Sequence, residues 1–378
     1  MDDGTLYTIP AVYESEELMT AGGPLIREDF SKKIGVSREN WPLTFADWEQ
    51  MFVDAKNHPD LQNVIPFMFS GIGVFTDIPV FLGAWGIRQE WYHVDGKVKF
   101  GAVQPEYKEF LSLMRRWYSM GFIDTEFAAN TGKMQDEKVT SDRVLSLPGY
   151  MGGSVTRYTA IMRPTNPDFT LLPVNYPILE TGAPVSSCNR NQNYIGGIAI
   201  TTAAKDPDMM CQFYDYFYSD EGHILTNWGV EGISYEYNAK GELDFLPLVK
   251  NNPDGLSREQ AMAKYTIWQS ISAVYKKKDV LEQRDSLPEQ IQYRRNWLDG
   301  NSANFMPLVT PTIEESTEFA AIMTDVNNFY RETATNIIMG AIDLDSGFDN
   351  MVNTLNGMGI QRATELRQDA YDRFMARP

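Results

Sequence analysis

The sequence is poor in the residues that most often bind metal ions or form disulfide networks. Its 378 residues include only three histidines, His58, His93 and His223, and two cysteines, Cys188 and Cys211. None of the histidines has a second ligand at the spacing of a zinc site, and two cysteines are too few for a disulfide framework. We therefore expect no metal site. One bridge between the cysteines is an open alternative, although two free thiols fit their sparse use better.

Positive charge is also scarce. The chain has 33 Lys and Arg residues against 51 Asp and Glu residues, which gives a net charge of −18. The longest basic cluster is Lys276-Lys277-Lys278. Because nucleic acids are bound mainly through their phosphates, this balance excludes DNA and RNA as expected partners.

Long apolar runs are absent as well. No stretch approaches the roughly 18 apolar residues that a membrane-spanning helix requires. The first residues, MDDGTLYTIP, have neither the basic region nor the apolar core of a signal peptide. Residues 6–10 instead predict a strand, which places a structural element unusually close to the start of the chain.

The common enzyme motifs are missing too. There is no HExxH, no GxSxG and no Walker-type glycine loop, and the glycines at Gly71 and Gly152 lack the spacing of a dinucleotide fingerprint. A calcium loop beginning at Asp343 fails because its sixth position is not glycine and its twelfth is Thr354. We expect no cofactor, and we expect Ser346 to cap a helix instead.

What the sequence does contain is a large apolar fraction with alternating helix and strand patterns. Hydrophobic residues make up 43% of the chain, enough for two or three domains at this length. Helices are predicted after Thr44, from Pro105 and from Pro207, the last with Met210, Phe213, Tyr214 and Phe217 facing inward. Strands are predicted over residues 63–69, 142–147, 169–175 and 195–202. This alternation indicates an α/β chain with largely parallel sheets.

The last third of the chain changes character. Three consecutive helical patterns begin near Thr312, Ser346 and Ile360, with no strand pattern between them. We expect these helices to pack together as a C-terminal helical layer.

One short stretch, WGVEGISYE, concentrates binding chemistry. It places Trp228, Glu231 and Tyr235 close together, with a glycine on each side of the first carboxylate. Three interpretations are open: a catalytic carboxylate against an aromatic wall, a grip on a polar ring, or a turn with its tryptophan in the core. Trp85 and Tyr150 also fall at predicted loops beside amides and carboxylates. Aromatic faces with neighbouring planar polar groups suit sugar rings.

These pieces also resemble a known family. The segments LYTIP, PLIREDFSKKIGV, LTFADWEQMF, DGKVKFGAVQPEYKEFLSLMRRWYSMGFID, TNPDFTLLPV, IGGIAITTAAKDPDMMCQFYDYFYSDEGHILTNWGVEGISYE and IMTDVNNFYRETATNIIMGAIDLDSGFDNMVNTLNGMGIQRATELRQDAYDRF follow one another along nearly the whole chain. In this order they are similar to the family 1 extracellular solute-binding proteins of bacterial ABC importers, in the lipoprotein branch that takes up oligosaccharides.

The resemblance implies a type II periplasmic-binding-protein-like fold, with two α/β lobes joined by hinge strands and a C-terminal helical layer. Lobe one is expected to comprise residues 1–12 and 195–310, and lobe two residues 13–194 and 311–378. Members of the family normally have a signal peptide, a lipid-modified cysteine and the first elements of lobe one before the strand that opens this chain. We therefore expect lobe one to lack its N-terminal part here.

The resemblance also suggests which residues line the cleft. The first crossing brings Tyr13 and Glu14, and loops of lobe two bring Phe75, Asp77 and Tyr150. Further candidates are Trp85, Arg157, Asn191 and Asn193. In this setting Trp228 is interpreted as a stacking platform, Glu231 as an acceptor for sugar hydroxyls or a carboxylate that fixes the turn, and Tyr235 as a neighbouring contact.

The resulting hypothesis is a binding protein and not an enzyme. It is expected to capture a carbohydrate, in oligosaccharide form, and to deliver it to the permease subunits of an ABC transporter; family members act outside the cell on a lipid anchor. From the residues given, we expect neither a signal peptide nor a lipidation cysteine in this chain. The alternative is a glycosidase or lyase that uses paired carboxylates in an aromatic cleft.

Overall fold

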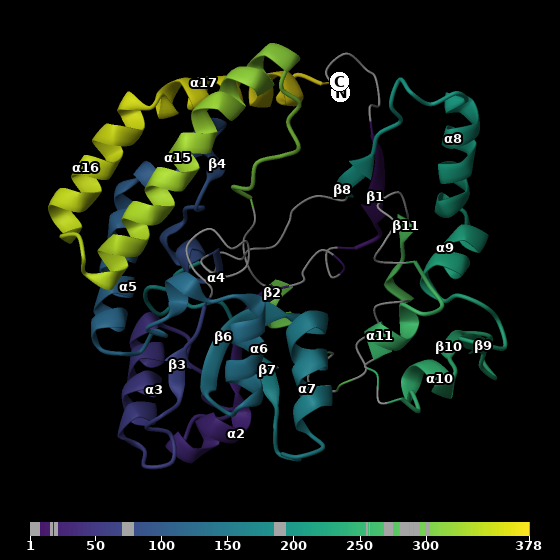
Figure 1. The fold of residues 1–378 in the computed structure, drawn as a ribbon, viewed down its shortest axis with the longest axis horizontal. Helices are drawn as coiled ribbons and strands as arrows, with labels where there is room; N and C mark the ends of the chain where they lie inside the picture. Colours follow the sequence, from purple (N-terminus) through teal and green to yellow (C-terminus); the bar gives the residue numbers. More distant parts are fainter. Residues whose placement is uncertain are drawn as a thin grey trace.

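Two lobes lie side by side in the computed structural model, and the chain crosses between them several times (Figure 1). The structure describes residues 8–15, 18, 22–69, 79–184, 194–254, 256, 258–267, 275–279, 287, 290, 295–298 and 303–377. We call the lobe with the four-stranded sheet the large lobe and the lobe with the three-stranded sheet the small lobe.

The large lobe is built on a sheet with the strand order β3-β6-β2-β7. These strands are β2 (Gly22–Arg27), β3 (Ile65–Phe67), β6 (Val144–Tyr150) and β7 (Leu171–Pro173). The strands predicted at residues 63–69, 142–147 and 169–175 are thus confirmed. β3 runs parallel to β6, but β2 runs antiparallel to both β6 and β7.

The expectation of largely parallel sheets is therefore wrong. The chain enters β2 from the small lobe, whereas β3, β6 and β7 are each reached through helices of the large lobe. Crossover helices return the chain to the same end of the sheet, so these three strands share one direction. A strand entered from the opposite lobe starts where the others finish, and β2 is consequently reversed.

The predicted helix starts of the large lobe are confirmed by their hydrogen bonds. In α3 (Phe45–Asn57), the hydroxyl of Thr44 accepts from the backbone N–H of Asp47 at 3.2 Å. The Asp47 carboxylate accepts from the Thr44 N–H at 2.8 Å, which completes a capping box. Pro105 occupies the first turn of α5 (Pro105–Ser119), where its missing N–H costs no helical hydrogen bond.

The remaining elements of the large lobe surround its sheet. They are α2 (Glu28–Ser31), η1 (Lys32–Ile34), α4 (Pro79–Leu82), η2 (Gly83–Trp85), β4 (Trp91–Val94), β5 (Lys97–Phe100), η3 (Gly101–Val103), η4 (Phe127–Ala129), α6 (Gly132–Thr140), the π-helix η5 (Met151–Thr156) and α7 (Arg157–Met162).

The C-terminal helices form the expected layer. Helix α15 (Ile313–Met339) packs against α5 and against its successors α16 (Leu344–Gly357) and α17 (Ile360–Met375) (Figure 1). The expectation that Ser346 caps α16 is wrong, because Asp343 is the cap. The Asp343 carboxylate accepts hydrogen bonds from the N–H and the hydroxyl of Ser346 at 3.0 and 2.9 Å.

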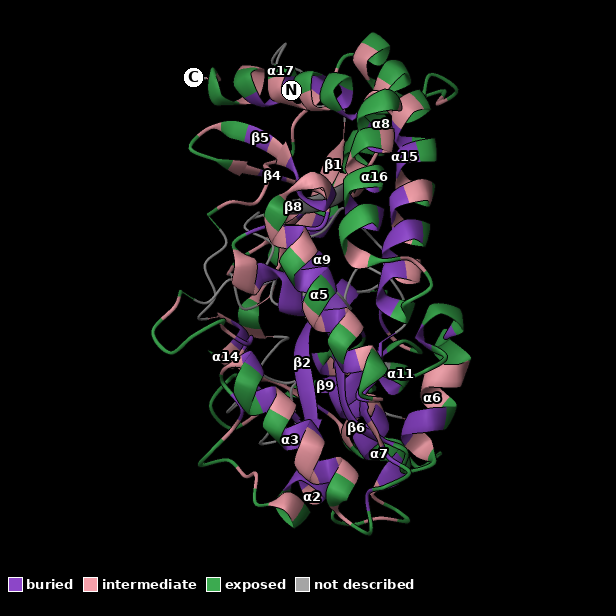
Figure 2. Ribbon diagram, turned by 90° about the vertical axis from the view of Figure 1, so that its left-hand side faces the viewer, coloured by how far each residue is buried: buried purple, intermediate pink, exposed green. Residues whose placement is uncertain are grey.

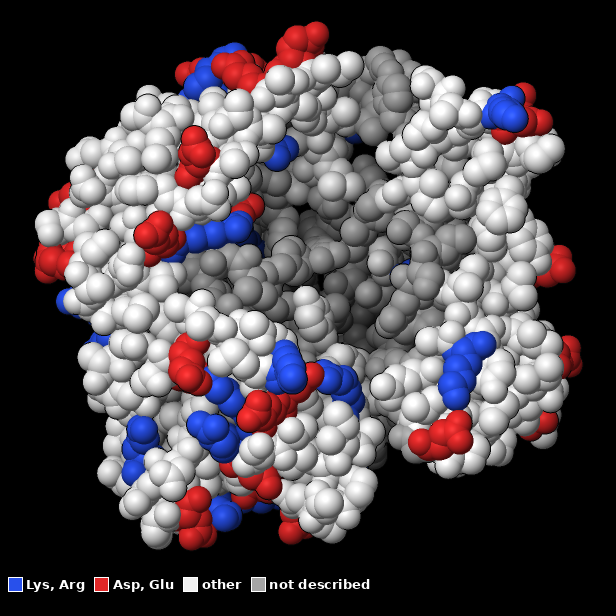
Figure 3. Space-filling view, viewed as in Figure 1, with Lys and Arg blue, Asp and Glu red and all other residues white. Residues whose placement is uncertain are grey.

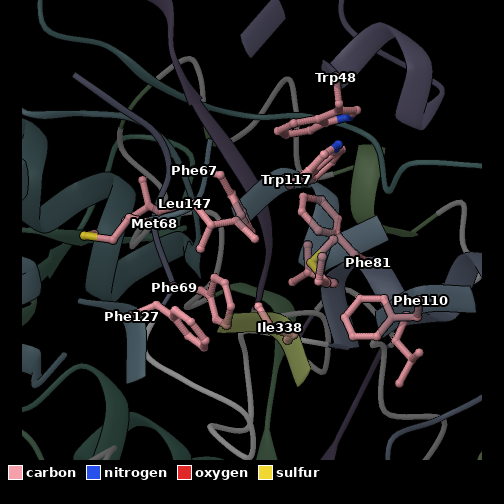
Figure 4. Close-up of a cluster of buried hydrophobic side chains, with 14 of the residues drawn as sticks. Trp48, Phe67, Met68, Phe69, Phe81, Phe110, Trp117, Phe127, Leu147 and Ile338 are labelled. Carbon is pink, nitrogen blue, oxygen red and sulfur yellow. The ribbon is translucent and has the colours of Figure 1, made fainter. Parts of the chain in front are cut away.

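Aromatic side chains dominate the core of the large lobe (Figure 4). The Trp48 and Phe81 rings lie 5.3 Å apart, and the Trp117 ring meets Phe81 edge to face at 5.9 Å. Strands β2 and β6 lie inside this core, covered by helices whose outer faces are exposed (Figure 2). Edge-to-face contacts of this kind add to the free energy gained from apolar burial.

The small lobe carries a sheet of order β11-β1-β8, formed by β1 (Ile9–Tyr13), β8 (Tyr194–Ile198) and β11 (Tyr275–Lys276). Its other elements are α8 (Pro207–Asp215), η6 (Tyr216–Tyr218), α9 (Asp220–Asn227), β9 (Tyr235–Tyr237), β10 (Leu243–Phe245), α10 (Pro247–Lys250) and α11 (Arg258–Met262). The strand predicted at residues 195–202 corresponds to β8, and that predicted at residues 6–10 overlaps β1.

Helix α8 begins at Pro207 as predicted, but its apolar side chains do not face inward. Met210 and Phe213 are 37% and 56% exposed, Tyr214 is half-buried, and only Phe217, beyond the helix end, is buried. The inward orientation expected from the helical pattern is therefore wrong. Periodicity identifies the apolar face of a helix, but the elements packed beside it decide whether that face is covered.

The expected boundary of lobe one at residue 310 is also wrong. Helix α14 (Arg295–Leu298) packs in the large lobe, where the indole N–H of Trp297 donates to the carbonyl of Val174 at 3.1 Å. Asn304 is likewise tied to the large lobe, because its side-chain oxygen accepts from the guanidinium of Arg88 at 2.9 Å. The chain has thus returned to the large lobe before residue 310; the rest of the proposed division stays a prediction.

Among the helices that the structure describes, none combines the length and the apolar character needed to cross a membrane.

Candidate functional site

The two lobes face each other across a hollow in the molecular surface (Figure 3). The chain crosses from β1 to β2, from β7 to β8 and from β11 to α14. In the large lobe, β3 runs parallel to β6, and both β6 and β7 run antiparallel to β2. The strands β3, β6 and β7 therefore all end at the edge of the sheet where β2 begins. Ligands of α/β proteins bind at the carboxyl ends of strands, which makes this edge the candidate site.

Tyr150 lies at this edge. It is the last residue of β6 and pairs with Gly22, the first residue of β2 after the crossing from the small lobe. Its side chain is 40% exposed, although the six residues before it in the strand are buried. The N–H of Tyr150 donates to the hydroxyl of Ser154 at 3.1 Å, so the following π-helix fixes the strand end. The arrangement places a partly exposed aromatic side chain at a strand end that is held by a hydrogen bond.

Tyr13 and Glu14 lie at the corresponding end of the small-lobe sheet. The Tyr13 ring is half-buried, with the ammonium group of Lys276 5.4 Å from its centroid. The Glu14 carboxylate accepts from the N–H of Lys278 at 2.6 Å. Glu14 is therefore engaged in fixing the strand end. Lys276 was not predicted; only its place in the lysine cluster pointed to it.

The segment after β11 is held by a buried histidine that the sequence did not single out. His223 is 2% exposed, and its Nε2 lies 3.0 Å from the Asp279 carboxylate, while Nδ1 lies 3.3 Å from the carbonyl of Tyr275. This contact anchors the start of the third crossing to α9. A lone histidine on a helix gave no sequence signal for it, because its partner is 56 residues away.

Arg157 and Trp85 have partners within the large lobe. The Arg157 guanidinium pairs with the Asp136 carboxylate, with one N–H···O distance of 2.7 Å, and this hydrogen bond lowers the pKa of Asp136. The Trp85 indole N–H donates to the Glu109 carboxylate at 3.1 Å, and its ring packs 5.0 Å from Phe45. Both side chains are partly exposed, but each already has a partner within the large lobe. Their proposed ligand contacts stay predictions.

Trp228 does not lie on the surface. It is 0% exposed, it stacks on Phe245 at 4.5 Å, and its indole N–H donates to the Asp279 carboxylate at 3.3 Å. Tyr235 is only 6% exposed and packs edge-on against it at 6.3 Å. The expectation that Trp228 is an exposed stacking platform is therefore wrong, because both aromatics form the core of the small lobe together with Val249 and Met262.

The glycines of WGVEGISYE serve the turn and not a ligand. Gly229 and Gly232 have φ angles of +91° and +75°, in the region that glycine adopts most readily. A Cβ at Gly229 would lie 2.5 Å from the hydroxyl oxygen of Ser234. Glu231 is exposed at the tip of the turn, where its backbone forms an isolated β-bridge with Tyr235. Of the three interpretations of this stretch, the turn with its tryptophan in the core fits the structure.

The remaining predicted contacts, Phe75, Asp77, Asn191 and Asn193, lie outside the described residues. Cys211 is an exposed free thiol, and Cys188 also lies outside the described part. Within that part, no group of three or more His, Cys, Asp or Glu side chains is arranged to hold a metal ion.

Comparison with known proteins gives the fold a context. No family model matches the chain. The chain is 24% identical over 409 aligned residues to the fructooligosaccharide ABC transporter substrate-binding protein FusA of Streptococcus pneumoniae, covering 99% of this chain and 70% of that protein. It is 22% identical to the lipoprotein LipO of Bacillus subtilis, covering 95% of this chain and 69% of LipO.

Solved structures agree on the fold. The alginate-binding protein AlgQ2 without calcium ion matches with a TM-score of 0.78 at 22% identity, over 98% of this chain and 75% of that one. FusA in complex with kestose matches with a TM-score of 0.75 at 20% identity, over 99% and 77%. The chain thus has homologues among the substrate-binding proteins of ABC transporters, and it has their type II periplasmic-binding-protein-like fold.

Proposed function

We propose that this protein captures an oligosaccharide in the cleft between its lobes and delivers it to the transmembrane permease of an ABC importer. The observation that carries the proposal is the similarity to FusA, a fructooligosaccharide-binding protein, along 99% of the chain. The cleft geometry supports it, because the exposed ring of Tyr150 stands at the strand edge where ligands of α/β folds bind.

The proposed binding event is lobe closure. The chain passes between the lobes from β1 to β2, from β7 to β8 and from β11 to α14, and we propose that one lobe rotates toward the other about these connections. Tyr150 on the large lobe and Tyr13 on the small lobe would then meet the ligand from opposite sides. A sugar ring offers C–H groups to the aromatic faces, and its hydroxyls bind the polar side chains beside them.

Titration calorimetry against a panel of neutral oligosaccharides that includes kestose tests this proposal. We expect Tyr150→Ala to weaken binding by about 5- to 150-fold, by analogy with the ~1–3 kcal/mol of aromatic stacking platforms. The melting temperature should change little, because the ring is 40% exposed. Tyr237→Ala is the matched control, since this tyrosine is 48% exposed on β9, outside the strand edge that carries Tyr150.

Binding of kestose-type glycans by Tyr150→Ala at parental affinity would remove Tyr150 from the site. Failure of the parent to bind any glycan of the panel would contradict the proposed function itself.

We further propose that the ligand is released unchanged. The carboxylate singled out by the sequence, Glu231, is exposed on a turn of the small lobe whose aromatic neighbours are buried, and this setting does not support a role in bond cleavage. Incubation of the panel with the protein, followed by product analysis, should show intact glycans. Shortened products that disappear in Glu231→Gln would favour the glycosidase or lyase alternative.

We further propose that the protein is located outside the cell. LipO is named a lipoprotein, and a lipid anchor would hold a binding protein beside its permease. Metabolic labelling of the native protein with a fatty acid analogue checks this part, and absence of label would contradict it.

A further inference from the structure

The connection that returns the chain from the small lobe to the large lobe carries a buried amide, Gln290. It lies between β11 and α14, in the third of the crossings, and it is 0% exposed. Glutamine is mostly found at the surface of proteins, and burial of an amide without hydrogen bonds costs free energy. The partners of this side chain therefore decide whether the connection is held in place.

Both ends of the Gln290 amide have partners. Its Nε2 donates to the hydroxyl of Thr156 at 2.6 Å and to the carbonyl of Met151 at 3.2 Å. Its Oε1 accepts from the N–H of Leu287 at 3.1 Å. One end of the amide thus holds its own connection, and the other end holds the large lobe. A carboxylate in its place would set an acceptor against the Met151 carbonyl, so the contact is specific to an amide.

The two partners in the large lobe are the first and last residues of the π-helix η5. Met151 and Thr156 are both buried, and the Thr156 hydroxyl also donates to the Met151 carbonyl at 3.3 Å. Single π-helical turns are rare, and they occur frequently at functional sites. Gln290, which is 134 residues away from Thr156 in sequence, therefore joins the two ends of this turn.

The same π-helix fixes Tyr150. Tyr150 directly precedes η5, and its N–H donates to the hydroxyl of Ser154 at 3.1 Å. Ser154 is buried and lies so close to β6 that a Cβ at Gly149 would be 2.6 Å from its hydroxyl oxygen. A displacement of η5 would therefore move Ser154 and the strand end that carries the exposed tyrosine. The contacts run without a break from the third crossing through η5 to Tyr150.

We propose that Gln290 is a positioning residue of the ligand site, because it couples the third crossing to the π-helix that sets the place of Tyr150. When the crossing shifts as the lobes close, the amide moves η5 with it. Binding of a ligand to Tyr150 then acts back on the crossing by the same free energy. The effect on ligand affinity rests on the proposed function, whereas the hold of Gln290 on Tyr150 does not.

Hydrogen exchange, measured by mass spectrometry on the protein without ligand, tests this hold. Gln290→Leu removes both donors at a similar side-chain volume, and Thr156→Val removes the hydroxyl that accepts one of them. We expect the amides of residues 150–156 to exchange at least about fivefold faster in both variants, because local opening of η5 then breaks fewer buried hydrogen bonds. The amides of α17 should keep the parental rate.

Gln89→Leu is the matched control. Gln89 is also buried, and its Nε2 donates to the hydroxyl of Tyr330 in the C-terminal layer at 3.3 Å. This variant therefore loses a buried amide-to-hydroxyl hydrogen bond of the same kind, but one that does not involve η5. The exchange of residues 150–156 should remain at the parental rate.

Gln290→Glu provides a readout that depends on pH. Burial raises the pKa of the introduced carboxyl group. At pH ~5 the protonated group can donate to the Thr156 hydroxyl, whereas at pH ~8 the ionised group cannot donate. After correction for the intrinsic effect of pH on exchange, residues 150–156 should exchange nearly as in the parent at pH ~5 and faster than in the parent at pH ~8.

Calorimetry with kestose and the neutral panel tests the effect on the ligand site. We expect Gln290→Leu to raise the Kd by about 5- to 20-fold, the lower part of the range usual for coupling between two sites of one protein. Gln89→Leu should bind with parental affinity. A residue that only stabilised the fold would lower the melting temperature in both variants and leave both affinities unchanged.

Parental exchange of residues 150–156 in both Gln290→Leu and Thr156→Val would overturn the inference, whether or not a glycan binds. Faster exchange together with unchanged glycan affinity would also overturn it, because Gln290 would then hold η5 without serving the site. A parent that binds no glycan would contradict the proposed function, and faster exchange would in that case still support the hold of Gln290 on Tyr150.

Discussion

Replacement of Trp228 by alanine tests the assignment of this residue to the core of the small lobe. Among the described residues, the buried members of that core are Trp228, Tyr235, Phe245, Val249 and Met262. Trp228 is its largest side chain and is fully buried. Removal of the indole leaves a cavity, breaks the stack on Phe245 at 4.5 Å and frees the Asp279 carboxylate from the indole N–H at 3.3 Å.

The expected cost is about 3–5 kcal/mol, the usual range for truncation of a buried tryptophan. With urea m-values of about 1–3 kcal/mol/M, the unfolding midpoint should fall by about 1 M or more. Because the described buried cluster around Trp228 is much smaller than that of the large lobe, the small lobe should unfold first and separate the transition into two steps. Urea titration followed by circular dichroism measures both effects.

The control for this experiment is Tyr237→Ala. Tyr237 touches Tyr235 edge-on at 6.0 Å from the exposed side of the same hairpin, and it is 48% exposed. Its loss should cost less than about 1 kcal/mol. An unchanged urea midpoint for Trp228→Ala, together with weaker glycan binding, would refute the reasoning and restore the platform interpretation.

Two further predictions concern backbone and charge. In urea titration, Gly229→Ala should destabilise the small lobe by more than ~1 kcal/mol, because the new Cβ would meet the Ser234 hydroxyl. Gly232→Ala should cost less, because Gly232 has a similar φ but open space around it. Equal losses in the two variants would contradict this steric argument. The hydrogen bond from Arg157 lowers the pKa of Asp136 in the folded state. The Asp136 carboxylate therefore stabilises the fold above its unfolded pKa of about 4, and this contribution is lost as the pH falls through the lower folded pKa. Arg157→Met should therefore flatten the decline of the urea midpoint below pH ~4, and an unchanged decline would contradict the pairing.

The sequence predicted those features that short-range hydrogen bonds specify. The capping box of Thr44 and Asp47 and the first-turn position of Pro105 fix the starts of α3 and α5 within a few residues of chain. These contacts form wherever the helix goes, so the sequence pattern alone is sufficient. The order of the family-like segments likewise predicted the two-lobed fold, which the comparison with AlgQ2 supports.

The candidate site was predicted less completely. Tyr150 was identified as an aromatic after a strand, and the structure places it exposed at the edge of the sheet. The same reasoning placed Trp228 in the cleft. A tryptophan beside a glycine turn has the same local sequence pattern whether its side chain points into the core or toward solvent, so the sequence did not distinguish the two.

The sequence by itself determined the starts of α3, α5 and α8 and the positions of β3, β6, β7 and β8, since each of these depends on residues that are close together in the chain. Only the tertiary structure decided which apolar faces are covered, as the buried Trp228 and the exposed Phe213 show. It also decided the reversed direction of β2 and the docking of Trp297 in the large lobe. Burial and strand direction depend on which distant segments meet, and that choice is made by the free energy of the whole packed chain and not by any local pattern.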